Sequence, residues 1–306
     1  VIERLTADKK RPAVHTYNAT LNSFTKFFGG QGTEEMLVTD VFTAGKLKEY
    51  EAWLRSRNAS WNTVSTYMRV LKAVYNRLVE AKRLTYDARL FDSVYTKVEA
   101  QSKRSLTEEQ MNTLLHTDFE KLPEDVQNVL AYFLLMFLFR GMPFIDMAYL
   151  RKQDLKEHCI TYCRHKTGKK MVVRIPHEAT ALFEKCRNKK TDSGYLFPIL
   201  DETTENDKKL YKNYRQALRT FNRKLAKMAA LLLPGTNISS YTARHTWATL
   251  AFYSGIPIGI ISKALGHSSI KVTETYLKPF ENEKVDAAND ELIMSVVKRS
   301  KEKIVA

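Results

Sequence analysis

The chain has 306 residues and a strongly basic composition, with 49 lysines and arginines against 34 aspartates and glutamates and a formal net charge of +15. This length is sufficient for two domains, and the charge indicates a polyanionic partner. No apolar run reaches the roughly 20 residues that a membrane span needs, and no signal-peptide pattern opens the sequence. We therefore expect a soluble, cytoplasmic protein without a membrane partner. The three cysteines form no C-x-x-C pair, so they indicate neither a zinc site nor a disulfide framework.

Apolar residues recur at helical spacing in three stretches of the first 100 residues, at about 11–28, 43–57 and 60–82. The first stretch ends at Gly29 and Gly30, which are typical of a helix stop. Lysines and arginines occupy the polar sides of these helices. The pattern predicts a small helical bundle over residues 1–100, and its charged face is by itself equally typical of a solvated surface.

Residues 101–106 are polar and basic, which predicts a linker before a second domain over residues 107–306. Thr107 with Gln110 three residues later is a capping signature for the first helix of that domain. The nearly continuous apolar stretch Val126 to Phe139 is too short to span a bilayer, so it predicts a central core helix. Two short strands flank a basic, glycine-containing turn at residues 166–170, which predicts a hairpin. The expected fold class is mainly α, with a small antiparallel sheet in the second domain.

Residues 239–277 gather three side chains that suit a reaction at a phosphodiester. Tyr241 and Arg244 are three residues apart and share one face of a predicted helix. Gly266 is a typical helix stop and leaves His267 on a turn, and Tyr276 lies about two turns into the next helix. Arginine can balance phosphate charge, histidine can donate a hydrogen bond or move a proton, and a phenol can attack phosphorus.

The strings ARHTWAT, LGHSS and TETYL, in this order, resemble the closing motifs of the tyrosine site-specific recombinases, the phage integrase and Xer-like family. The family text is H-x-x-R-H, then L-G-H, then a tyrosine nine residues after that histidine, and His267 and Tyr276 keep this interval. The resemblance covers the C-terminal two-thirds of the chain clearly. It implies an N-terminal helical core-binding (SAM-like) bundle and a mostly helical catalytic domain.

The resemblance also implies roles for single residues. Tyr276 is the nucleophile that forms a 3'-phosphotyrosyl intermediate, while Arg244 and His267 contact the scissile phosphate. Lys166 corresponds to the hairpin lysine that protonates the departing 5' oxygen, and Lys169 is the rival for that role. An arginine on a helix or a lysine on a turn is otherwise usually a solvated surface charge.

Two positions depart from the family text. Tyr241 replaces the first histidine of H-x-x-R, which removes an imidazole but keeps a hydroxyl. Pro143 stands where the family has its first arginine, and proline cannot bind phosphate through its side chain. Arg140 is the substitute that the sequence offers, although a cation at a helix end is favourable for ordinary reasons. We expect Asp146 to brace an arginine.

The resemblance implies a double-stranded DNA partner, a homo-tetramer joined through a C-terminal helix at about 285–303, and accessory DNA-bending proteins as further partners. It implies no cofactor, neither a metal ion nor ATP, because arginines supply the positive charge and the phosphotyrosyl bond conserves the energy. The expected outcome is integration, excision or inversion of DNA. Two alternatives stay open, a type IB topoisomerase-like relaxing enzyme and a non-catalytic regulator that binds DNA through a helix-turn-helix at 257–277.

Overall fold

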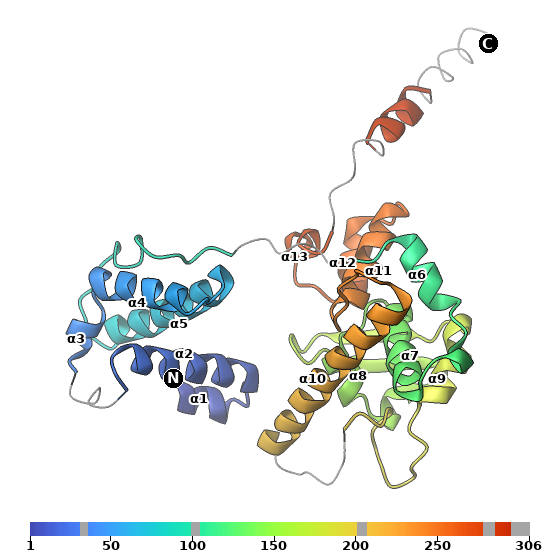
Figure 1. Cartoon of the computed structure of the whole chain (residues 1–306), viewed down its shortest axis with the longest axis horizontal. Helices are drawn as coiled ribbons and strands as arrows, with labels where there is room; N and C mark the ends of the chain where they lie inside the picture. Colours follow the sequence, from blue (N-terminus) through green and yellow to red (C-terminus); the bar gives the residue numbers. More distant parts are fainter. Residues whose placement is uncertain (31–35, 99–104, 201–206, 278–284, 295–306) are drawn as a thin grey trace. The chain divides into compact units, whose positions relative to one another are not determined.

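The computed structural model describes residues 1–30, 36–98, 105–200, 207–277 and 285–294. The chain divides into two compact units, residues 1–102 and 103–306 (Figure 1). Most of the predicted linker and the end of the predicted C-terminal helix, after residue 294, lie outside the described residues. Within the described ranges, no helix is long and apolar enough to cross a membrane.

The first unit is a bundle of helices around an aromatic core. Its helices are α1 (Ile2–Ala7), α2 (Arg11–Phe27), α3 (Val38–Val41), α4 (Ala44–Ser56) and α5 (Trp61–Glu80). Thr43 and Ser60 cap α4 and α5 by accepting hydrogen bonds from backbone N–H groups. The ring of Phe24 on α2 meets that of Tyr50 on α4 at 4.8 Å, and both residues are buried. The predicted helical bundle is confirmed.

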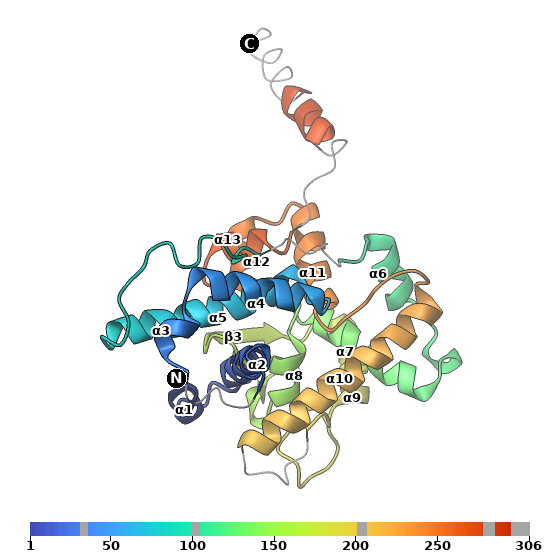
Figure 2. The same cartoon turned by 60° about the vertical axis from the view of Figure 1, so that its left-hand side comes forward.

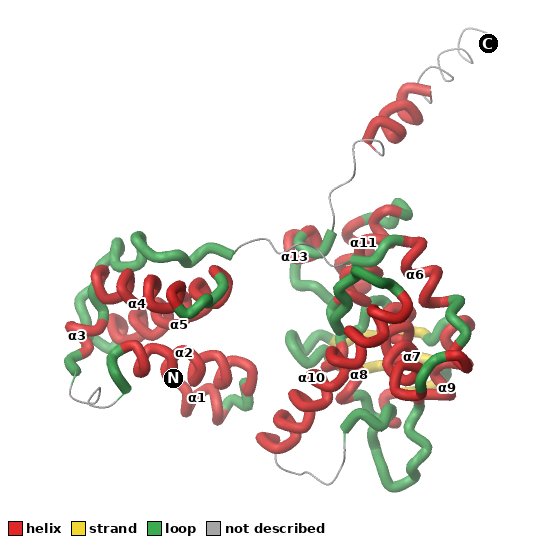
Figure 3. The backbone as a smooth tube through the Cα atoms, in the orientation of Figure 1, coloured by secondary structure: helices red, strands yellow, loops and turns green. Residues whose placement is uncertain are grey.

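The second unit is also mostly helical, with a small sheet that Figure 3 shows among the helices. Its helices are α6 (Glu108–Leu115), η2 (Phe119–Lys121), α7 (Glu124–Leu138), α8 (Phe144–Tyr149), η3 (Lys152–Asp154), η4 (His177–Ala179), α9 (Thr180–Cys186), α10 (Asp207–Leu232), α11 (Thr242–Tyr253), α12 (Ile258–Leu265) and α13 (Ile270–Glu274), and residues 285–294 are helical as well. The capping box at Thr107 and Gln110 starts α6 as predicted.

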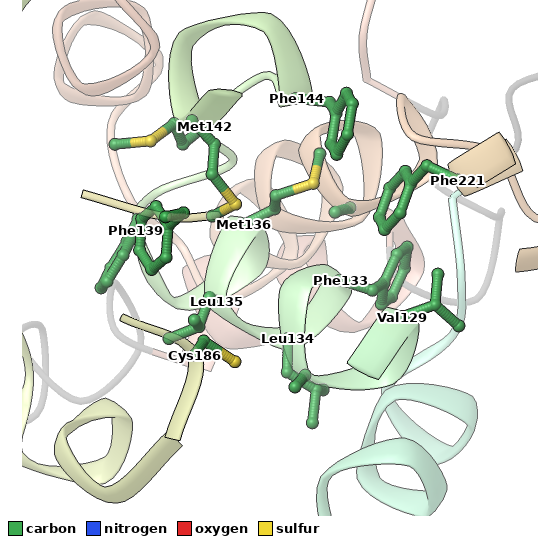
Figure 4. Packing of buried hydrophobic residues seen from close by; sticks show 14 of the residues in the cluster. Val129, Phe133, Leu134, Leu135, Met136, Phe139, Met142, Phe144, Cys186 and Phe221 are labelled. Atoms are coloured by element: carbon green, nitrogen blue, oxygen red, sulfur yellow. The ribbon is translucent and has the colours of Figure 1, made fainter. Parts of the chain in front are cut away.

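Helix α7 is the central support of the second unit. It packs against α9, α10 and α11, and both views show α10 running beside it (Figures 1 and 2). Because it is apolar on nearly all sides, other elements can cover it all round. Figure 4 shows Phe133 and Met136 of α7 near the stacked rings of Phe144 and Phe221, whose centroids are 4.3 Å apart. The prediction of a central core helix is therefore confirmed.

The sheet has three antiparallel strands in the order β1 (Leu155–Lys156), β2 (Cys159–Cys163) and β3 (Lys170–Arg174). The predicted hairpin forms its larger part, with Cys159 opposite Arg174 and Cys163 opposite Lys170. The turn closes through two backbone hydrogen bonds, from Arg164 N to Lys169 O at 2.9 Å and from Gly168 N to Arg164 O at 2.8 Å. This closure gathers several basic side chains at one end of the sheet.

The chain leaves α7 through two residues in left-handed backbone conformation, Arg140 with φ of 59° and Gly141 with φ of 66°. A Cβ atom at Gly141 would lie 2.9 Å from the Cα atom of Arg244, which is closer than real Cβ contacts. Glycine is required at this position because the end of α7 approaches the backbone of α11 so closely.

Replacing Gly141 by alanine should therefore be more destabilising than the same change at a roomy glycine. Gly168 is the matched control, because its φ is +69° and nothing lies within 4 Å of its Cβ position. We expect Gly141→Ala to lower the free energy of unfolding by at least about 1 kcal/mol more than Gly168→Ala. Urea unfolding midpoints measure the difference, and equal midpoints would contradict the proposed close approach.

Candidate active site

Helices α11, α12 and α13 form a compact cluster with an apolar core of its own, made by Ala248, Ala251, Ile261, Leu265 and Leu277. Gly266 ends α12 in left-handed conformation, and its N–H and that of His267 donate to the carbonyls of Lys263 and Ser262. A Cβ atom at Gly266 would lie 2.7 Å from Met171 Sδ and 2.8 Å from Arg164 Cδ. The turn that carries His267 therefore lies directly against the β2–β3 hairpin.

Arg244 joins three parts of the second unit through its buried guanidinium, since the residue is only 2% exposed. Nη1 donates to the carbonyl of Gly141 at 2.9 Å, and Nη2 donates to the carbonyl of Leu265 at 2.5 Å. Nη2 also lies 3.0 Å from Nε2 of His267. One side chain thus connects the end of α7, helix α11 and the end of α12.

The partners of His267 define where its proton is. A guanidinium only donates hydrogen bonds, so Nε2 must accept from Arg244 and the proton must be on Nδ1. Nδ1 then donates to Oγ1 of Thr273 at 2.9 Å. Burial, followed by the charges of Arg244, Arg164 and two lysines, lowers the pKa of His267 to about 4. The imidazole is therefore neutral at neutral pH.

Tyr276 lies on the turn two residues after the end of α13, so the prediction that it lies two turns into that helix is wrong, because the helix has only five residues. The ring centroid of Tyr276 is 4.7 Å from that of His267 and 4.6 Å from that of His245, and the two planes of the second pair are 27° apart. The guanidinium carbon of Arg244 is 5.6 Å from the same ring. Three of the residues that the sequence singled out, the arginine, the histidine and the tyrosine, are therefore neighbours within one chain.

Arg164 is a further arginine of this cluster, and the sequence reasoning missed it. It follows β2 and is 6% exposed, with Nη1 donating to the carbonyl of Leu265 at 2.9 Å. Its Nε donates to Oδ2 of Asp146 at 3.3 Å, while the N–H of His165 donates to Oδ1 at 2.8 Å. The expectation that Asp146 braces an arginine is confirmed, and the arginine is Arg164. The available signal was a basic residue directly after a strand, two positions before Lys166.

Arg140 is the predicted substitute for the first arginine of the family text, and the structure places its side chain against strand β3. Its side chain is exposed, and Nη1 donates to the carbonyl of Val172 on β3 at 3.4 Å. Within the described ranges, Arg140 makes its one side-chain hydrogen bond to this strand. Arg164, not Arg140, is the arginine that shares the carbonyl of Leu265 with Arg244.

The remaining predicted residues lie around the same pocket. Lys166 is exposed on the β2–β3 turn, and Lys169 on the same turn donates to the carbonyl of His267 at 3.3 Å. Tyr241 precedes α11 with half of its surface exposed, and its ring is 6.3 Å from that of His245. Both lysines are close enough for their charges to act on the imidazole of His267.

Comparisons with known proteins agree with this geometry. The profile described as "Phage integrase family" matches residues 104–283, and the phage integrase SAM-like domain matches residues 1–89. The chain belongs to the phage integrase family. This phage integrase family member is 26% identical to tyrosine recombinase XerA of Pyrococcus furiosus over 243 residues, 77% of this chain and 76% of XerA. It is 27% identical to transposase B of transposon Tn554 from Staphylococcus aureus, over 76% of this chain and 38% of the transposase.

Solved structures of integrases share the fold of this family member. A lambda integrase dimer bound to a COC' core site matches with a TM-score of 0.62 and 14% identity, over 90% of this chain and 94% of that one. The Tn1549 transposon integrase in complex with transposon right end DNA matches with a TM-score of 0.62 and 17% identity, over 96% and 99%. The predicted fold class is confirmed.

The protein is therefore an enzyme of site-specific DNA recombination, as the motifs from Arg244 to Tyr276 predicted. The relatives are recombinases, integrases and a transposase. They favour the recombinase prediction over a relaxing topoisomerase and over a non-catalytic regulator.

The low pKa of His267 predicts a specific dependence of stability on pH. The unfolded chain binds a proton on this residue below about pH 6.5, whereas the folded protein does so only near pH 4. The free energy of unfolding should therefore fall as pH decreases from 6.5 towards 4, by up to about 1.4 kcal/mol per pH unit from this residue.

Urea unfolding at pH 7 and pH 5 measures this contribution when the protein is compared with His267→Gln. The variant should lose less stability between the two pH values, because the other titrating groups are common to both proteins. Equal losses would show that the imidazole does not resist protonation.

Proposed function

We propose that Tyr276 cleaves one DNA strand at a specific site and forms a 3'-phosphotyrosyl bond, from which a second strand is rejoined. The phenolic oxygen attacks phosphorus and the 5' oxygen leaves, so the energy of the broken bond is kept for the reverse attack by another 5' hydroxyl. The single observation that carries this proposal is the contact of the Tyr276 ring with His267 and Arg244 in one chain.

Arg244 and Arg164 are the proposed ligands of the scissile phosphate. Both donate to the carbonyl of Leu265, so two buried guanidinium groups lie next to each other. Burial and the charge of Arg164 lower the pKa of Arg244, which reflects the repulsion between the two cations. The Nε donor of Arg244 is buried and has no hydrogen-bond partner in the described part of the chain. A phosphate anion would relieve this repulsion and accept that free hydrogen bond.

The β2–β3 turn supplies the proposed proton donor to the leaving 5' oxygen. Lys166 is exposed at the tip, where a DNA backbone can reach it, and it remains our candidate. Lys169 is the alternative, and its hydrogen bond to the carbonyl of His267 ties it to the pocket. We propose that the hydroxyl of Tyr241, at the exposed start of α11, contacts the phosphate backbone at the rim. The proposed chemistry uses no metal ion, ATP or other cofactor.

We propose residues 1–100 as a DNA core-binding domain, 101–106 as the linker and 107–306 as the catalytic domain, and the division of the chain at residues 102 and 103 supports this. The protein would act as a homo-tetramer on double-stranded DNA. Helix 285–294 carries Leu292 and Ile293, each more than half exposed, as apolar residues for a neighbouring subunit. Accessory DNA-bending proteins would assist assembly.

The nucleophile assignment predicts the behaviour of two tyrosine variants. Tyr276→Phe should bind DNA normally and form no covalent adduct, because it lacks the attacking oxygen. Tyr253→Phe, a change on the neighbouring helix α11, should form the adduct at the normal rate. Nicked suicide duplexes made from candidate target DNA trap the adduct for denaturing electrophoresis, and an adduct with Tyr276→Phe would refute the assignment.

The arginine assignment is tested by comparing Arg164→Lys with Arg140→Ala. Lysine keeps the charge but loses the planar fork, so Arg164→Lys should slow adduct formation at least about 100-fold with DNA binding retained. Arg140→Ala should slow it much less. Circular dichroism confirms that both variants fold. The opposite ranking would assign the phosphate contact to Arg140, the residue that the sequence favoured.

A further inference from the structure

Thr273 is a buried residue that touches both the histidine and the nucleophile of the proposed site. It lies on α13 with 0% of its surface exposed, and its hydroxyl is 2.9 Å from Nδ1 of His267. Its backbone carbonyl accepts the N–H of Tyr276 at 2.8 Å. Because of this double contact, the position of the Tyr276 backbone and the hydrogen bonding of His267 depend on one residue.

The other side of the imidazole has to change its hydrogen-bonding role during the reaction. In the DNA-free protein, Nε2 of His267 accepts from Arg244. A phosphate oxygen only accepts, so His267 can bind it through Nε2 only if Nε2 carries a proton. Gaining a second proton would place an imidazolium beside Arg244, Arg164 and Lys169, which repel it. The alternative is to move the proton from one nitrogen to the other.

The hydroxyl of Thr273 allows the proton to move between the two ring nitrogens, because it can form a hydrogen bond with either tautomer of His267. It can accept a hydrogen bond from a protonated Nδ1, and after rotation it can donate one to a bare Nδ1. A carboxylate in the same place would only accept and would hold the proton on Nδ1. A valine of the same shape would offer no partner to either form and would leave a buried Nδ1 unsatisfied.

We propose that Thr273 is a positioning residue that lets His267 change its tautomer when a phosphate enters the site. Without phosphate, Nδ1–H donates to Thr273 and Nε2 accepts from Arg244. With phosphate, one proton leaves Nδ1 to solvent and one from solvent binds Nε2, so the imidazole is neutral before and after the change. Nε2–H then donates to a phosphate oxygen and the Thr273 hydroxyl donates to Nδ1. This proposal rests on the proposed function of the site.

Long-range proton–nitrogen NMR of protein labelled with ¹⁵N in histidine reports directly which ring nitrogen carries the proton. The signals of His267 are assigned by their loss in His267→Gln. At neutral pH the free protein should show the proton on Nδ1, and dimethyl phosphate, a phosphodiester without an O–H group that is added as the probe, should shift it to Nε2. Thr273→Ser should behave in the same way, because it keeps the hydroxyl. Thr273→Val should not make the shift.

Adduct formation on the suicide duplex gives the second measurement. Thr273→Val should be about tenfold slower, the effect of one lost hydrogen bond, and Thr273→Ser should restore most of the rate. A thermal unfolding scan of both variants separates this effect from misfolding.

Three results would overturn the proposal: a proton on Nε2 in the free protein, no proton shift up to saturating dimethyl phosphate, or a shift induced by dimethyl phosphate that persists in Thr273→Val. The NMR measurement does not require cleavage. A tautomer shift in a protein that forms no adduct would therefore count against the proposed function alone, and an adduct without the shift would count against the role of Thr273 alone.

Discussion

The buried guanidinium of Arg244 is the interaction on which the catalytic unit depends. A charge in the interior is strongly unfavourable unless its hydrogen bonds are satisfied. The carbonyls of Gly141 and Leu265 and the Nε2 atom of His267 provide partners from three separate elements. The three hydrogen bonds therefore fix the positions of these partners relative to the guanidinium. The end of α7 carries a glycine at its closest approach to Arg244, and burial together with the charge of Arg244 keeps His267 neutral.

The same arrangement leaves the site electrostatically incomplete without an anion. Arg164 and Arg244 share the carbonyl of Leu265, and the one carboxylate that is ion-paired with either of them in the described structure, that of Asp146, is bonded to Arg164 alone. The pocket therefore has more buried positive charge than its own groups balance. Such an imbalance reduces the stability of the free protein and increases its affinity for a phosphodiester. Tyr276 lies beside these cations, with its ring centroid 5.6 Å from the guanidinium carbon of Arg244.

The parts of the fold and site that could be predicted from the sequence are those set by local spacing. The apolar stretch of α7, the helical position of Arg244 and the turn that carries His267 follow from short-range patterns, and the structure brings Arg244, His267 and Tyr276 together. Arg164 could not be found in this way, because its partner Leu265 is 101 residues distant in the chain. The position of Arg140 depends on its left-handed backbone, which a helix-ending pattern does not specify.

The departure at Pro143 and the position of Arg164 are structurally linked through Asp146. Pro143 cannot bind phosphate, but its fixed φ suits the start of α8, where it is the cap. Starting α8 there places Asp146 in the first turn, and its carboxylate holds both the N–H of His165 and the guanidinium of Arg164. Gly266 has no side chain, so Arg164 can pass directly against the turn that carries His267. The helix that begins with Pro143 therefore supplies, through Asp146, the carboxylate that holds Arg164 beside Arg244.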